Sequence, residues 1–375
     1  MTTSRVAVTG ASGHVGSRLI RTLREHPDIS NLLGIDVRPW KGPVDDRTQF
    51  FRLDVCSDAL PDLLKRARVD TVLHLAVAQR DVLDPERMHE INVIGTLNVL
   101  RACQAAGVRR LIATSSTAVY GFRPDNPLYM TENHPVRPNQ DLPYARDKAE
   151  MERVIRAVAD KRTNIKVTIL RPAMTLGSGV FSLLSPFLEK RHAPYLLGFD
   201  PLVQLLSLKD LNRGLLAALM SDADGTFNLV GKGVLPYSHA LHQTGRLPVP
   251  IPSARLAHVG FSALWYLRMA QSSPGAVGLL RYPLLASGDR ARDELGFEPQ
   301  DDATACLAQA MARQTPQREV GNARDDTLLE VLRDYSTGRE KLEIDKMRTA
   351  LRRGVLRVDR EGRGEEDRVS QRKGR

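Results

Sequence analysis

The chain has 375 residues, enough for two domains, and its 42% hydrophobic and 26% charged content excludes a disordered or fibrous protein. Its three cysteines, Cys56, Cys103 and Cys306, stand far apart, which excludes a disulfide scaffold and a structural zinc site and favours a reducing compartment. The net charge is +10, but the arginines are scattered among acidic residues. We therefore expect no nucleic-acid partner, and instead an attraction for small anionic molecules.

Short apolar runs alternate with helix-like stretches through the first half of the chain. Strands are predicted at 6–9, 33–37, 71–76, 110–115 and 166–171, and helices at 15–25 and 92–106. Continuous apolar strands that alternate with helices are typical of βαβ units. The sequence therefore predicts an α/β fold, a doubly wound parallel sheet of the Rossmann type.

The pattern changes after Pro172, where glycine, proline and leucine become frequent. A strand and a helix return at about 205–220, and a further strand is predicted at 226–230. We expect a first domain at 1–173, with returning segments at about 203–231, and a smaller discontinuous C-terminal domain at 174–202 and 232–312. Residues 313–375 are predicted to form a charged helical tail with a disordered end.

The segment 259–267 is strongly apolar. We expect it to pack as core between helices of the second domain, and the alternative is a wall that faces lipid or sterol. No apolar run reaches the roughly 18–20 residues that cross a bilayer, and the first residues leave no room for a signal peptide. A cytoplasmic protein with no integral membrane segment is expected.

Three glycines, Gly10, Gly13 and Gly16, follow the first predicted strand and open the first predicted helix. Such a loop permits a tight turn, a close approach of the backbone to a pyrophosphate, and close packing of the helix on the sheet. Asp36 stands at the end of the second strand, where a carboxylate accepts hydrogen bonds from the adenosine ribose. The arrangement favours NAD, although Arg38 could tolerate NADP. The first domain is thus expected to bind a dinucleotide and the second a substrate.

Tyr144 and Lys148 are four residues apart, which places both side chains on one face of a helix. The pKa of a free phenol is about 10, so a phenol is a poor base at neutral pH. A nearby ammonium and an oxidised nicotinamide favour the phenolate, which can take a proton from a substrate hydroxyl. Ser116 follows a predicted strand and can hydrogen-bond the reacting oxygen. We interpret Ser116, Tyr144 and Lys148 as a catalytic trio.

These motifs together resemble the extended short-chain dehydrogenase/reductase family, in its NAD-dependent epimerase/dehydratase branch, and are similar to UDP-glucose 4-epimerase-like proteins. The resemblance covers about residues 5–312 and includes 289–299, which is similar to the C-terminal helix signature of the branch. It implies an NAD-dependent enzyme. The cofactor-binding residues expected from the motifs and the resemblance are Gly10, Ser12, Gly13, His14, Val15, Gly16, Asp36, Asp54, Val55, Leu75, Ala76, Asn92, Thr114, Tyr144, Lys148 and Arg171.

Two features depart from the sugar-nucleotide epimerases. Met174 stands near the place where those enzymes usually carry an asparagine, and the arginines that clamp a pyrophosphate cannot be identified beyond three candidates by position, Arg246, Arg255 and Arg281. The spacing of His192, His239, His242 and His258 lacks the pattern of a metal site, so no metal is expected.

Three functions stay open on these grounds. The first is hydride transfer at a carbinol or ketone carbon, with a nucleotide sugar as the small-molecule substrate. The second is a hydroxysteroid-dehydrogenase-like reaction on an apolar alcohol or ketone. The third is a non-catalytic NAD-binding regulatory protein, for which loss of the trio would be expected. The resemblance also leaves open a homodimer built from the helices at 92–106 and 144–160.

Overall fold

The computed structural model describes residues 4–78, 85–159, 164–177, 180, 182–267, 269 and 272–311, which all belong to a compact unit that spans Met1–Asp325. The predicted charged tail at 313–375 lies outside these described residues. Among the described residues, no helix combines the length and the apolar character that crossing a bilayer requires.

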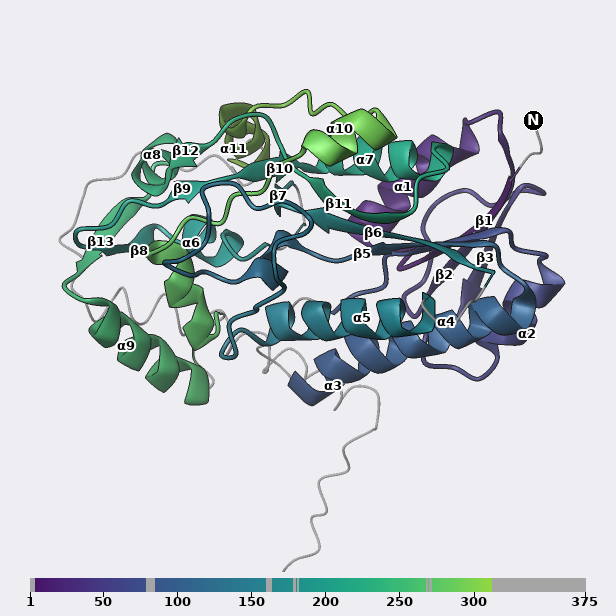
Figure 1. Ribbon diagram of the computed structural model, residues 1–375, viewed down its shortest axis with the longest axis horizontal. Coiled ribbons are helices and arrows are strands. Elements are labelled where there is room, and N and C mark those ends of the chain that lie inside the picture. The colour runs from purple at the N-terminus through teal and green to yellow at the C-terminus, as the bar shows by residue number, and fades with distance from the viewer. Residues whose placement is uncertain are drawn as a thin grey trace, which may run out of the picture. The chain divides into compact units, whose positions relative to one another are not determined.

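A seven-stranded sheet forms the centre of this unit (Figure 1). All its neighbouring strands pair in parallel, in the order β11-β6-β5-β4-β1-β2-β3. The strands are β1 (Ser4–Thr9), β2 (Ile29–Asp36), β3 (Thr48–Arg52), β4 (Thr71–His74), β5 (Arg110–Thr114), β6 (Lys166–Pro172) and β11 (Gly225–Leu229). The predicted doubly wound parallel sheet is confirmed, and the late strand at 226–230 does return to it.

Helices cover both faces of the sheet because each strand carries apolar side chains on both sides. In β1, Val6 and Val8 belong to one buried cluster and Ala7 to the other. Figure 1 shows α1 (His14–Arg24), α7 (Leu208–Met220) and α10 (Asp289–Leu295) above the sheet, with α2 (Leu60–Arg66), α4 (Gly95–Ala106) and α5 (Pro143–Ala159) below it. Ahead of α4, α3 (Pro85–His89) and a π-helical turn, η1 (Glu90–Ile94), continue the same helical run.

The remaining elements lie mostly toward the left-hand end in Figure 1, with β7 and β10 nearer its middle. Three two-stranded sheets pair β7 (Met174–Leu176) with β10 (Leu205–Ser207), β9 (Leu202–Val203) with β12 (Leu235–Pro236), and β8 (His192–Leu196) with β13 (Leu247–Ile251). The helices here are α6 (Ser185–Glu189), α8 (Tyr237–Gln243), α9 (Ala254–Tyr266), η3 (Pro274–Leu280) and α11 (Ala303–Met311), and a short 3-10 turn, η2 (Thr117–Tyr120), follows β5.

The prediction that 259–267 packs as core is wrong. Val259 is 65% exposed, Tyr266 is 82% exposed and Leu267 is 67% exposed. The physical reason is that α9 is apolar on two sides. Its inner side, with buried Ala257, packs on the protein, and its outer side is left at the surface.

Candidate active site

The loop between β1 and α1 brings its glycines into contacts that leave no room for a side chain. Gly10 has a φ of +73°, and a Cβ there would lie 2.7 Å from the backbone nitrogen of Ala76. A Cβ on Gly16 would collide with the carbonyl oxygen of Gly10. Gly13 is the N-cap of α1, and no side chain caps this end of the helix. Exposed His14 then opens the helix. This glycine-lined helix N-terminus fits the pyrophosphate of a dinucleotide.

The carboxylate of Asp36 is buried beside this loop, at the carboxyl end of β2. Its oxygens accept hydrogen bonds from the backbone N–H groups of Ser12 and Arg38, each at 2.9 Å. The Arg38 guanidinium also forms an ion pair with it, with Nε 3.3 Å from Oδ1. The carboxylate is thus fixed at the carboxyl end of β2, the position from which dinucleotide-binding folds use an acidic residue for the ribose, and Arg38 is placed beside it.

Asp54 and Val55 follow β3, the strand next to β2. The Asp54 carboxylate accepts a hydrogen bond from the backbone of Cys56 and pairs with Arg87 at 2.9 Å. Val55 is buried, and its carbonyl accepts a hydrogen bond from Asn98 at 2.7 Å. Both residues therefore lie at the edge of the sheet that also holds Asp36.

The segment that follows β4 is held by two side chains. The Thr9 hydroxyl oxygen accepts a hydrogen bond from the backbone N–H of Ala76. Asn92 is buried and binds the backbone of Ala78 twice, accepting from its N–H at 2.8 Å and donating to its carbonyl at 3.0 Å. Asn92 is not among the residues that line the cavity described below. It instead shapes the loop that carries Leu75 and Ala76.

Buried His74 connects this loop to β1 and α4. Thr96 donates its hydroxyl proton to the carbonyl of Asn92 at 2.6 Å, so the Nε2–H of His74 is the donor toward Thr96 at 3.0 Å. The Nδ1 atom then accepts from the Thr9 hydroxyl at 2.8 Å. Burial, together with the charge of nearby Lys148, lowers the pKa of His74 to about 3. His74 is therefore a neutral structural link at physiological pH.

Ser116, Tyr144 and Lys148 line one cavity at the carboxyl ends of the parallel strands. The cavity is partly open to solvent, and the space in it that a water-sized group can occupy is about 90 Å³. Ligands of doubly wound sheets bind at this edge. The predicted cofactor residues Val15, Leu75 and Thr114 line the same cavity. The other wall comes from the end of β6 and the residues after it, from α7, and from the segment that follows η3. These lining residues are Pro172, Ala173, Met174, Thr175, Val180, Ser182, Leu183, Leu211 and Leu284.

Lys148 is buried on α5, and its ammonium donates a hydrogen bond to the carbonyl of Thr114 at 2.6 Å. Burial lowers the pKa of Lys148 to about 8, while the charges of Glu152 and Asp147 oppose that fall. The Ser116 hydroxyl oxygen accepts a hydrogen bond from the backbone N–H of Ala118 at 3.2 Å, which orients it and leaves its own proton available to donate. The cavity thus holds an ammonium, a phenol and a hydroxyl in one place.

Arg171 is placed elsewhere. Its guanidinium forms a bidentate ion pair with Glu152 of α5, at 2.8 Å and 2.6 Å, and donates to the Tyr120 hydroxyl at 2.8 Å. The side chain is buried and is not among the residues that line the cavity. The guanidinium is thus held by Glu152 and Tyr120, and the cofactor contact of Arg171 stays a prediction. The pair with Glu152 fixes α5 against β6.

The three candidate pyrophosphate arginines also lie away from the cavity lining. Arg281 stacks over the rings of Phe199 and Tyr282, Arg246 contacts the sulfur of Met311, and Arg255 is exposed on α9. Sequence reasoning missed the polar lining residues Thr175 and Ser182, although the position of Thr175 just after β6 could have indicated that residue. No sequence signal marked Leu211 or Leu284.

Comparisons with known proteins point to one family. A sequence model described as the NAD dependent epimerase/dehydratase family matches residues 6–229. An uncharacterized protein of Mycobacterium tuberculosis is 32% identical over 304 residues, which cover 78% of this chain and 80% of that protein.

A second relative is the N-acetyl-α-D-glucosaminyl-diphospho-ditrans,octacis-undecaprenol 4-epimerase of Escherichia coli O157:H7. It is 35% identical over 192 residues, 48% of this chain and 52% of the relative. Among solved structures, MoeE5 in complex with UDP-glucuronic acid and NAD superimposes with a TM-score of 0.65 at 23% identity, covering 82% of this chain and 98% of the other. At that identity the structural likeness shows a shared fold.

Proposed function

Since the chain belongs to the NAD-dependent epimerase/dehydratase family, we propose that it transfers a hydride at a carbinol or ketone carbon, with Ser116, Tyr144 and Lys148 as catalytic residues. The observation that carries the proposal is that these three side chains line one cavity at the strand ends, next to a glycine loop that fits a pyrophosphate. The proposal makes NAD the cofactor, held by the glycine loop and Asp36, with Thr114, Leu75 and Val15 along its path. We place NADP second because Asp36 is buried beside the loop.

The proposed mechanism assigns the proton to Tyr144. Bound NAD would supply the hydride acceptor. Ser116 donates a hydrogen bond to the reacting oxygen and positions it near the phenol. As a phenolate, Tyr144 takes the proton from the substrate hydroxyl. As a phenol, it returns that proton when the reaction runs in the opposite direction. The ammonium of Lys148, fixed by the Thr114 carbonyl, stabilises the phenolate and is mostly charged at neutral pH because its pKa is about 8.

Two substrate classes are proposed for this site. A sugar linked to a diphosphate is supported by the family and by the E. coli relative, whose name gives such a substrate. An apolar alcohol or ketone is supported by the cavity itself. Met174, Leu183, Leu211 and Leu284 form much of its far wall, and among the described lining residues only Tyr144 and Lys148 are ionisable.

A Tyr144→Phe variant tests the catalytic proposal. Loss of the phenolic proton carrier is expected to lower turnover at least about a hundredfold with little change in NAD affinity. Tyr129→Phe is the matched control, because Tyr129 is exposed and lies outside the cavity lining. Unchanged turnover in Tyr144→Phe would remove the phenol from the mechanism. If both the native chain and the Tyr144→Phe variant bind NAD but turn over no substrate, the result would favour the regulatory alternative.

A thermal-shift screen of the NAD-loaded chain separates the substrate classes. A ligand at 100 times its dissociation constant adds about 2.7 kcal/mol to stability, so UDP-, GDP- and dTDP-sugars can be compared directly with sterols. The release of nicotinamide then separates the reaction types. Cofactor that leaves only on denaturation supports an epimerase, whereas net NADH that appears with substrate supports a dehydrogenase.

The proposal extends to the domains of the chain, its location and its oligomeric state. Residues 1–173, with 203–231, are proposed as the dinucleotide-binding domain, and 174–202 with 232–312 as the substrate-binding domain. A cytoplasmic location is proposed from the three widely separated cysteines. A homodimer formed through α4 and α5 is proposed from the family resemblance. Sedimentation analysis of the full chain tests the dimer.

A further inference from the structure

One surface of the protein is apolar, exposed and separate from the cavity lining: the outer side of α9. We define the α9 stripe as Leu256, Val259, Ala263, Tyr266 and Leu267. A helix turns by about 100° per residue, so these spacings place all five on one side. Leu256 is 59% exposed, and Val259, Tyr266 and Leu267 are more exposed still. Monomeric soluble proteins rarely leave such a contiguous apolar patch unless it binds something.

The charge around the stripe identifies the kind of partner. Residues 225–288, which contain α9, include no aspartate or glutamate, although 44 of the chain's 375 residues are acidic. The same stretch carries five basic residues, among them exposed Arg255 in the first turn of α9. The carboxylate of Asp141, which contacts α9, is paired with His258 at 3.1 Å. An apolar stripe on a segment whose charged residues are all basic, and whose neighbouring carboxylate is already paired, complements an anionic lipid surface.

Two other candidates to cover the stripe, a second copy of the chain and its own residues 312–375, fit less well than a lipid surface. A second copy that met this chain through the same stripe would place the cationic segment opposite itself, with like charges facing. The chain's own residues 312–375 contain more lysine and arginine than aspartate and glutamate, so they too would bring like charge. We propose that the α9 stripe docks the protein on the surface of a lipid bilayer that contains anionic headgroups.

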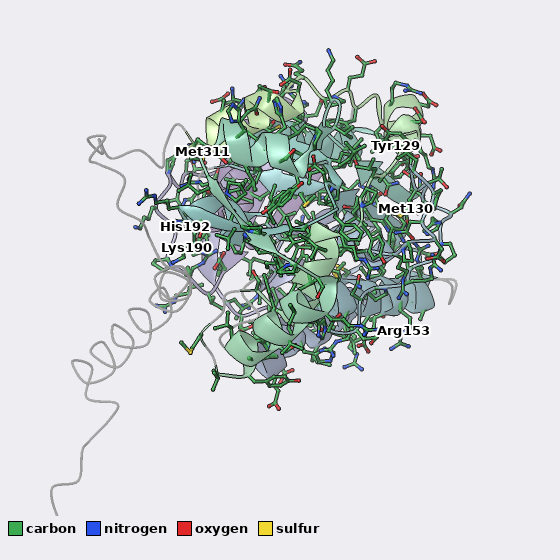
Figure 2. All side chains as sticks on the ribbon, turned by 90° about the vertical axis from the view of Figure 1, so that its left-hand side faces the viewer. Tyr129, Met130, Arg153, Lys190, His192 and Met311 are labelled. Carbon is green, nitrogen blue, oxygen red and sulfur yellow. The ribbon has the colours of Figure 1, made fainter. Side chains whose placement is uncertain are left out.

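The stripe lies close to the candidate active site. Phe261, on the inner side of α9, meets Phe187 of α6 with ring centroids 6.0 Å apart. Directly before α6, Ser182 and Leu183 line the cavity. His258 binds Asp141, which precedes Tyr144 by three residues. Figure 2 turns this end of the molecule toward the viewer and labels Lys190 and His192, which lie at the start of the β8 segment. Docking through α9 would hold the cavity next to the bilayer.

Vesicle sedimentation with the full chain tests the proposal. The chain is expected to sediment with vesicles of phosphatidylcholine that contain phosphatidylglycerol, and less with phosphatidylcholine alone. A Leu256→Glu/Val259→Glu double variant is expected to bind at least tenfold more weakly, because two apolar contacts are lost and two charges face the headgroups. The control, Leu128→Glu/Val136→Glu, adds the same charges at exposed apolar positions outside α9 and is expected to bind like the native chain.

Three outcomes would overturn the docking proposal. One is that the native chain fails to sediment with the anionic vesicles. Another is that the α9 variant binds as well as the control. The third is that the α9 variant breaks up a self-associated form of a chain that binds no vesicles, which would assign the stripe to a second copy. Should the double variant fail to fold, Val259→Ser gives the same test, with a severalfold loss of vesicle binding expected and unchanged binding counting against the proposal. Turnover in detergent-free buffer reports on the active site separately.

Discussion

Helix α5 carries three buried charged residues, Asp147, Lys148 and Glu152, and the last two, which stand one turn apart, are held in opposite ways. Lys148, which lines the cavity, has a carbonyl oxygen and a thioether as its recorded partners, Thr114 at 2.6 Å and Met151 at 3.8 Å. Glu152, which packs against β6, is held by the bidentate guanidinium of Arg171. Burial therefore lowers the pKa of Lys148 to about 8. For Glu152 burial acts to raise the pKa, but Arg171, with smaller contributions from Ser115 and Arg156, outweighs burial and the pKa is lowered.

The difference shows how one helix can serve both chemistry and structure. A buried charge without an opposite charge bonded to it is held near its titration range, which suits a group that must respond to a proton on a neighbouring phenol. A buried charge with a bidentate partner is fixed in one state and anchors the helix. The contrast leads to three predictions about stability, beginning with the largest.

The Glu152→Gln variant should show the largest effect. It leaves the Arg171 guanidinium buried without its counter-charge, and breaking a buried pair in this way costs about 3–5 kcal/mol. We expect a corresponding fall in the free energy of unfolding measured with denaturant. The control is Glu150→Gln on the same helix, since Glu150 forms an exposed pair with Arg153 and should cost at most about 1 kcal/mol. Equal losses in the two variants would show that Glu152 is not an anchor.

The Lys148→Met variant should change the pH dependence of stability. The folded pKa of Lys148 is about 8 and its ordinary value is 10.5, so between these pH values the unfolded chain holds a proton that the folded chain lacks. The free energy of unfolding of the native chain therefore rises with pH across this window. At about 1.4 kcal/mol per pKa unit, the native chain should gain about 3 kcal/mol relative to the variant between pH 8 and 10.5.

Denaturant titrations of both chains at several pH values measure that gain, and the comparison cancels the titration of groups that the two chains share. A difference that stays constant from pH 7 to 11 would mean that Lys148 titrates near its ordinary value in the folded protein. Turnover of Lys148→Met, measured in parallel, should fall as in Tyr144→Phe because the phenolate loses its neighbouring charge.

Local sequence signals were enough to predict most of the sheet and the cavity trio. The glycine loop and Asp36 follow from spacing, and the strands of the sheet interior are continuous apolar runs. The edge strand β3 has no such run, because Gln49, Phe51 and Arg52 are exposed, so its hydrophobic pattern does not reveal it. Arg171 shows a second limit. Its place at a strand end suggested a ligand contact, but its partner, Glu152, comes from a different element and no local pattern pairs them.

The α9 segment shows a third limit. Apolar composition predicts that a helix is buried, yet it does not tell how many of its sides the rest of the chain can cover. Here the inner side of α9 packs against α6 and the outer side does not, which only the tertiary arrangement reveals. Predicting the fold class from a sequence is therefore easier than predicting which apolar surface is left for a partner.

The smallest predicted effect separates the two arginines that meet Glu152. Arg156 is about half exposed, and its Nη2 lies 3.4 Å from Oε2 of Glu152 and 2.8 Å from the Thr226 hydroxyl. Because water screens a half-exposed charge, Arg156→Ala should cost at most about 1 kcal/mol in unfolding free energy, close to the loss in the control Arg153→Ala. A loss as large as that of Glu152→Gln would show that both arginines compensate the buried carboxylate. The anchor of α5 would then be a three-residue network, in which the second cation matters although it faces solvent.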